Sequence, residues 1–144
     1  MKKIVLLTAL LFSLNTYAEH YEIKMLNTSD EGSMVFEPGF LKAKVGDTVT
    51  FKPTNKGHFV QSRAVPEGAQ KFSSEEDEEL TVTLDKEGLY VYTCPVHRPM
   101  NMNGLIQVGD NPTNKEQAEK AVKDLEKRAT SNQGRLANYF AQVK

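Results

Sequence analysis

Short runs of β-branched, aromatic and aliphatic residues, each closed by turn-forming residues, constrain the fold of this chain most strongly. The runs are His20–Leu26, Leu41–Val45, Thr48–Pro53, Leu80–Leu84, Leu89–Cys94 and Gly104–Val108. The turn signals between them are Gly46-Asp47, Asn55-Lys56-Gly57, Pro66-Glu67-Gly68 and Lys86-Glu87-Gly88. Within one run, Leu80, Val82 and Leu84 alternate with threonines, as expected for a strand with one buried face. The pattern predicts a mainly β, sandwich-like domain.

The period of the apolar residues becomes helical after Asp110-Asn111-Pro112. The first apolar stripe comprises Ala118, Ala121, Val122, Leu125 and Ala129. Thr113 and Glu116 form a capping-box pattern, so we expect a helix over about residues 113–130. A second stripe, which predicts a shorter helix over about 134–143, comprises Leu136, Tyr139, Phe140 and Val143. These helices either pack on the sandwich or form a hairpin that binds a partner or a second copy.

The first 18 residues have the pattern of a secretory signal. A positive start precedes the apolar run Ile4–Leu14, and a polar stretch then ends in alanine. We expect residues 1–18 to be removed and residues 19–144 to form one exported domain without membrane insertion; an uncleaved anchor is the alternative. Without Lys2 and Lys3, the 18 basic side chains fall to 16 against 19 acidic ones. The resulting formal charge of −3 gives no indication of nucleic-acid binding.

Cys94 is the only cysteine of the chain, so it cannot form an intramolecular disulfide. His97, Met100 and Met102 follow it closely, which places thiolate, imidazole and thioether donors in one loop. His58 adds a second imidazole from a distant segment. Two imidazoles, a thiolate and a weak thioether favour copper that alternates between Cu(I) and Cu(II), which predicts electron transfer. The alternative is that Cys94 is a small buried core residue.

Other functions use the same kinds of donor. The additional methionines Met25, Met34 and Met100 suit a periplasmic copper-binding or copper-delivery protein, whereas ligands held on strands favour metal retention. Cysteine and histidine also suit a structural zinc ion. We expect no enzyme, because four protein ligands leave no open position for a substrate. His20 has no thiol nearby and is left out of the site.

Segments outside the metal-binding loop carry a family resemblance. They are Tyr21–Asn27, Met34–Pro38, Gly46–Phe51, Lys56–His58 and Pro66–Phe72. With these segments and its C-terminal helices, the chain resembles the pseudoazurins, small bacterial type 1 (blue) copper proteins of the cupredoxin family. The resemblance implies an eight-stranded Greek-key sandwich with two C-terminal α-helices and one copper ion near one end. The ligands that it implies are His58, Cys94, His97 and a methionine.

Two methionines compete for the axial position. The shortest cupredoxin loops place this ligand six residues after the cysteine, at Met100 here, whereas pseudoazurin loops place it eight residues after, at Met102. Met102 stands at the pseudoazurin distance from the next strand, so the resemblance favours Met102. Met100 is then an apolar surface residue beside His97.

The chain departs from the pseudoazurin pattern at two positions near the ligands. Pseudoazurins usually have asparagine after the first histidine ligand and threonine or serine after the cysteine, and these side chains hydrogen-bond to each other. Here the two positions are Phe59 and Pro95. Replacing both partners of a hydrogen bond by apolar groups can be nearly neutral. We therefore expect an intact site with a shifted reduction potential.

The resemblance also implies a role in denitrification-type electron transport. It describes a periplasmic, monomeric carrier of single electrons that docks through an apolar patch around His97. Its donor would be a c-type cytochrome or the cytochrome bc1 complex. Its acceptor would be copper nitrite reductase, nitrous-oxide reductase or a cytochrome c peroxidase.

Charged residues near the expected docking patch differ from the family's basic ring. Lys56 and Lys71 match ring positions, whereas Thr28 and Thr93 replace other lysines, so we expect weaker steering of acidic partners. The acidic run Glu75–Glu79 is either a solvated loop or a surface that gives the protein a preference for a basic partner.

Overall fold

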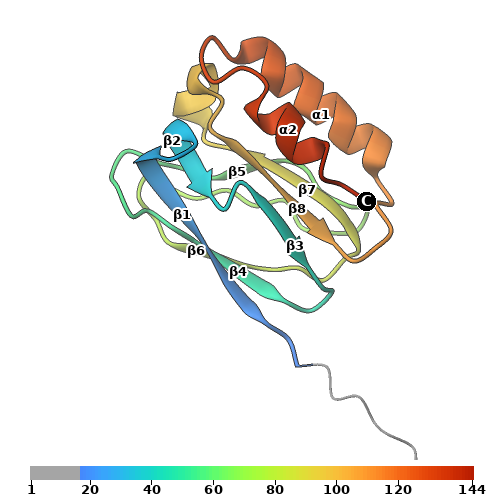
Figure 1. Ribbon diagram of the computed structural model, residues 1–144. Helices are drawn as coiled ribbons and strands as arrows, with labels where there is room; N and C mark the ends of the chain where they lie inside the picture. Colours follow the sequence, from blue (N-terminus) through green and yellow to red (C-terminus); the bar gives the residue numbers. More distant parts are fainter. Residues whose placement is uncertain (1–16) are drawn as a thin grey trace, which may run out of the picture.

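The computed structural model describes residues 17–144, which form two four-stranded sheets and two C-terminal helices (Figure 1). One sheet contains, in spatial order, β2 (Gly32–Glu37), β1 (His20–Ser29), β4 (Thr48–Lys52) and β6 (Leu80–Thr83). The other contains β3 (Phe40–Ala43), β8 (Asn103–Val108), β7 (Gly88–Thr93) and β5 (Gln61–Ala64). The chain crosses repeatedly between the sheets, and β1–β4 and β3–β8 are the parallel pairs. The predicted eight-stranded Greek-key sandwich with two C-terminal helices is confirmed.

Two strands, β2 and β5, were not predicted from the apolar pattern. β2 begins at a glycine and contains Met34 in a left-handed conformation (φ 50°), which interrupts a regular strand pattern. β5 has the polar sequence Gln-Ser-Arg-Ala, and its register with β7 shifts between Ser62 and Ala64. Both strands exist because a neighbouring strand pairs with them, which local residue preference does not reveal.

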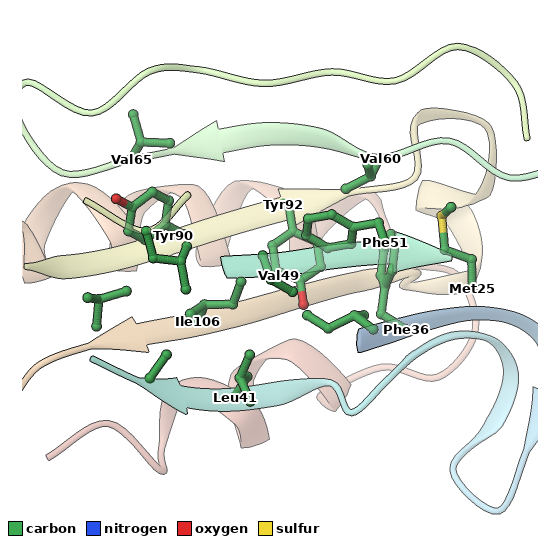
Figure 2. Close-up of a cluster of buried hydrophobic side chains, with 14 of the residues drawn as sticks. Met25, Phe36, Leu41, Val49, Phe51, Val60, Val65, Tyr90, Tyr92 and Ile106 are labelled. Carbon is green, nitrogen blue, oxygen red and sulfur yellow. The ribbon is translucent and has the colours of Figure 1, made fainter. Parts of the chain in front are cut away.

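The main core fills the space between the two sheets (Figure 2). Phe51 of β4 lies edge-on to Phe36 of β2 and Tyr92 of β7, with ring centroids 6.2 and 4.9 Å apart. Such aromatic pairs each contribute about 0.5–1.5 kcal/mol beyond the area that they bury. The same cluster includes Cys94 and Met102, so the packed interior continues directly into the predicted metal site.

Close contact between β7 and β8 restricts one position to glycine. Gly104 lies opposite Tyr92 in the antiparallel register. A Cβ atom at residue 104 would lie 2.4 Å from the Tyr92 ring, which is too close for any side chain without movement of the ring. Tyr92 is fully buried, so its ring has no free space into which to move.

The helices α1 (Lys115–Arg128) and α2 (Arg135–Phe140) cover the outer face of the sheet that contains β7 and β8 (Figure 1). This second core comprises Ala64, Leu89, Val91, Leu105, Ala118, Val122, Leu125, Leu136 and Tyr139. All residues of β7 and β8 are consequently buried. The helices therefore pack on the sandwich instead of standing free as a hairpin.

The predicted capping box of α1 is wrong. The helix begins at Lys115 after Asn114, and the Thr113 hydroxyl instead donates to the carbonyl of Glu87 at 3.1 Å. The Asn114 side chain accepts from the amide of Leu89 at 2.7 Å and donates to its carbonyl at 2.9 Å. The two side chains connect the helix start to β7 and to the residue before it, through long-range hydrogen bonds to the backbone instead of a local capping box.

The expected signal segment, residues 1–18, lies outside the described residues except for its last two. Its removal therefore stays a prediction. From residue 17 onward, the structure contains no helix with the length and apolar character needed to cross a bilayer.

Candidate metal centre

The predicted cysteine and methionine ligands lie at the ends of two adjacent strands. Cys94 directly follows β7 and Met102 directly precedes β8, and the short 3₁₀ helix η1 (Pro95–Met100) connects them. The Cys94 amide donates to the Met102 carbonyl at 2.9 Å, and the Met102 amide donates to the His97 carbonyl at 3.2 Å. The β7–β8 pairing thus holds three of the predicted ligand residues in one closed loop.

The fourth residue, His58, is held in the connection between β4 and β5 by an acidic side chain. Asp77 accepts hydrogen bonds from the amides of Gly57 and His58 at 2.8 and 3.1 Å. These amides lower the pKa of Asp77 below its usual range. Within the acidic run Glu75–Glu79, this residue therefore has a structural role that charge pattern alone does not reveal.

The His58 ring has one satisfied and one free nitrogen. Its Nε2 lies 2.8 Å from Oδ1 of Asn27, which selects the tautomer with hydrogen on Nε2. Its Nδ1 is buried and has no hydrogen-bond partner among the described residues. A buried nitrogen lone pair without a donor is costly unless a ligand such as a metal ion takes it up.

The donor atoms of His58, Cys94 and His97 all lie within 4.8 Å of one another. Cys94 Sγ is 3.4 Å from His97 Nδ1, and the two imidazole rings have centroids 5.1 Å apart. Donors that share one ion lie at such separations, since metal–nitrogen and metal–sulfur bonds are about 2.0–2.3 Å long. The residues present therefore fit a single transition-metal ion with sulfur and nitrogen ligands.

Burial shifts the pKa values of the histidine and cysteine donors in opposite directions. It lowers the pKa of both His58 and His97, which keeps the imidazoles neutral and able to act as ligands. It raises the pKa of the Cys94 thiol, despite hydrogen bonds from nearby amides. Copper binding at Cys94 must therefore displace a proton from sulfur.

The two candidate axial methionines have different environments. Met102 is fully buried in the main core together with Cys94, whereas Met100 is only partly buried in η1. These environments favour Met102 as the axial residue, which stays a prediction.

The Phe59 amide donates to Cys94 Sγ at 3.5 Å, so this backbone contact is made whatever side chain stands at residue 59.

A buried asparagine between the two methionines was missed by the sequence reasoning. Asn101 has a left-handed conformation (φ 56°), which asparagine tolerates better than most residues. Its Nδ2 donates to Glu126 Oε1 at 3.0 Å and to the Asn132 carbonyl at 2.9 Å, and its Oδ1 accepts from Asn103 at 2.6 Å. The only signal for this role in the sequence is the Asn-Met-Asn spacing.

Comparison with known proteins identifies the class to which this fold and site belong. Residues 23–109 match the model of the copper binding proteins of the plastocyanin/azurin family. The chain therefore belongs to the plastocyanin/azurin family of copper-binding proteins. It is a cupredoxin-type electron-transfer protein with one copper ion.

Within this family, the chain is similar to the pseudoazurins, as its sequence motifs predicted. The pseudoazurin of Paracoccus pantotrophus is 43% identical over 107 residues, which are 73% of this chain and 74% of that protein. The crystal structure of pseudoazurin from Methylobacterium extorquens AM1 has a TM-score of 0.77 and 36% identity, covering 87% of this chain and 99% of its own. The crystal structure of pseudoazurin from Hyphomicrobium denitrificans has a TM-score of 0.74 and 40% identity, covering 88% of this chain and 99% of its own.

Proposed function

We propose that this protein is a periplasmic one-electron carrier whose copper is held by His58, Cys94, His97 and Met102. The observation that carries the proposal is the convergence of two imidazoles and one buried thiol, with no hydrogen-bond partner for His58 Nδ1 within residues 17–144. A copper ion bound there supplies a Cu(I)/Cu(II) couple. The chain supplies a dry, fixed set of donors from two connections, which limits rearrangement when an electron enters or leaves.

The electron would enter through His97, the one imidazole of the pair that is only partly buried. Val96 is 56% exposed and Pro99 is also exposed, so apolar surface lies beside this ring. A small apolar contact suits a brief encounter between redox partners. Partner docking at this end would bring a donor or an acceptor close to Cys94 without exposing the sulfur.

Charges of both signs flank the proposed docking end. Lys56, Lys71 and Thr28 are exposed, whereas Thr93 is fully buried, so its assignment to the surface ring is wrong. Burial lowers the pKa of Arg98, and the positive charges of Arg63 and Arg128 lower it further. These three arginines form a basic group beside His97. Four exposed glutamates surround Asp77 near His58. We propose that the basic group faces an acidic reductase and the glutamates a basic cytochrome.

The test of this function is a Cu(II) titration of the purified protein, followed by visible absorption and reduction with ascorbate. We expect intense colour at one copper per chain that bleaches and returns reversibly. Colourless binding, or rapid transfer of copper to a metal-free acceptor protein, would favour copper delivery instead. Stopped-flow kinetics with a basic cytochrome and an acidic copper nitrite reductase, each over a range of ionic strength, then identify the partner class.

The proposed export has its own test. Expression with the first 18 residues, followed by fractionation and N-terminal sequencing, should give a periplasmic protein that begins at Glu19. A protein that stays in the membrane fraction with an intact N-terminus would contradict the proposal.

Exchanging the two methionines separately should identify the axial ligand. We expect Met102→Leu to shift the reduction potential and the copper spectrum, because the leucine side chain has no sulfur donor. Met100→Leu, which makes the same chemical change six residues after Cys94, should leave both nearly unchanged. Voltammetry and electron paramagnetic resonance of the two variants provide the measurement. The reverse result would move the axial ligand to Met100.

Restoring the pseudoazurin pair near the ligands should shift the potential. The double variant Phe59→Asn and Pro95→Thr introduces two polar side chains beside Cys94, while the amide of residue 59 can still donate to the sulfur. Because polarity around the thiolate tunes the couple, we expect a measurable change in midpoint potential. An unchanged potential in the double variant would remove this explanation for the departure.

A further inference from the structure

The C-terminal helices contact the metal-binding loop through a buried arginine that the family resemblance does not assign. Arg135, the first residue of α2, is only 8% exposed. Its guanidinium donates to the backbone carbonyls of Glu31, Ser33, Met34, Met100 and Asn101. None of these contacts is with a carboxylate. The buried cation therefore connects the β1–β2 turn and the start of β2 to the end of the ligand loop.

Other groups of the α1–α2 connection hold the same loop. The amides of Thr130 and Ser131 donate to the Pro99 carbonyl at 2.8 and 3.1 Å. Asn132 Nδ2 donates to the Met100 carbonyl at 3.0 Å. The carbonyls of three successive residues before Met102 are thus all bound by the C-terminal segment. In Figure 1 this connection lies at the same end of the molecule as the β1–β2 turn.

We propose that Arg135 is a positioning residue for the copper centre, which acts by fixing the backbone of Met100 and Asn101 and so the place of Met102. The inference rests on the proposed ligand role of Met102. Cys94 and Met102 are already linked by one backbone hydrogen bond, from the Cys94 amide to the Met102 carbonyl, so a loop anchored at Asn101 also limits movement at Cys94. Planar guanidinium geometry lets one side chain reach five carbonyls, which lysine cannot reproduce.

A purely structural role for Arg135 would give a different result from a positioning role. If the role of Arg135 were purely structural, its loss would weaken the whole domain. Any other variant of equal stability would then loosen the ligand loop to the same extent. Two controls separate these roles. Val122→Ala removes a buried contact of α1 with the sheet, and Tyr139→Phe removes the α2 hydroxyl that donates to Glu31 at 2.6 Å. Neither residue contacts the ligand loop through a hydrogen bond.

The experiment measures amide hydrogen exchange by NMR in the metal-free protein, compared at equal global stability. We expect Arg135→Met to speed exchange at Asn101, Met102 and Cys94 by about tenfold or more, with Arg135→Lys between wild type and Arg135→Met. Both controls should leave these amides unchanged. Equal exchange in Arg135→Met and Val122→Ala would overturn the proposal. If Arg135→Met does not fold, Asn132→Ala, which loses the Met100 contact, is judged by the same criterion.

A second measurement follows copper itself. In the copper-loaded protein, we expect Arg135→Met to release Cu(I) to a chelator about tenfold faster and to change the hyperfine splitting in electron paramagnetic resonance, as losses around metal ligands typically do. Unchanged release and spectrum, despite faster loop exchange, would overturn the link to copper. The exchange result does not need copper, so failure of the wild-type copper titration is distinguishable from failure of this inference.

Discussion

Cys94→Ser is expected to abolish the intense visible absorption of the copper-loaded protein. The substitution changes one buried atom, because serine has nearly the shape of cysteine, and the Phe59 amide can donate to its hydroxyl oxygen. The hydroxyl cannot supply the thiolate bond that gives blue copper centres their colour and redox behaviour. Absorption spectra of the wild-type and variant proteins after equal copper addition provide the measurement.

Circular dichroism should show that the Cys94→Ser protein remains folded, since the sandwich does not depend on a disulfide. Met100→Leu is the matched control in the same loop, and it should keep the colour. If the serine variant retained an intense absorption, Cys94 would not be the ligand. The function would then have to be sought in copper delivery or in a different set of donors.

Phe51→Ala should cause the largest loss of stability, about 3–5 kcal/mol in the free energy of unfolding. Phe51 has no exposed surface and contacts Phe36, Tyr92 and Phe72 with ring centroids between 4.9 and 6.2 Å apart. Removing its ring leaves a cavity between the two sheets that the surrounding strands can fill only in part. Equilibrium unfolding in guanidinium chloride, followed by circular dichroism, measures the loss.

Phe72→Ala makes the same chemical change at a less buried position. Its ring stacks on Phe51 at 5.7 Å but is only partly buried, so we expect a clearly smaller loss. Similar losses in the two variants would mean that the region around Phe51 can collapse into the space, contrary to the tight packing described for this core.

Much of the sandwich was predictable because its inner strands have an apolar pattern. The strands around Val49, Val82 and Tyr90 are rich in apolar residues and end at turn residues, and the structure contains a strand at each. β5 could not be found in this way. Its residues are mostly polar, and it is a strand because it pairs with β7 and forms a bridge to Ser73, both far along the chain.

The candidate site was predictable to a similar extent. Thiol and imidazole donors reveal themselves by residue type and spacing, and His58, Cys94 and His97 do lie together. The residues that hold these ligands in place cannot be recognised by residue type or spacing. Asn27 and Asp77 act through contacts with segments far along the chain, and asparagine or aspartate in a loop has many possible roles. Long-range backbone contacts such as those of Arg135 have no sequence pattern at all.

The contact between Gly104 and Tyr92 has a consequence for how this sequence can diverge. A side chain at residue 104 and a tyrosine at residue 92 exclude each other, because the ring occupies the place of the Cβ atom. Residue 104 therefore cannot change first: an alanine at residue 104 becomes acceptable only after residue 92 has become smaller. Homologous sequences that keep this strand pairing should show the two positions changing in concert, with glycine present wherever the tyrosine is.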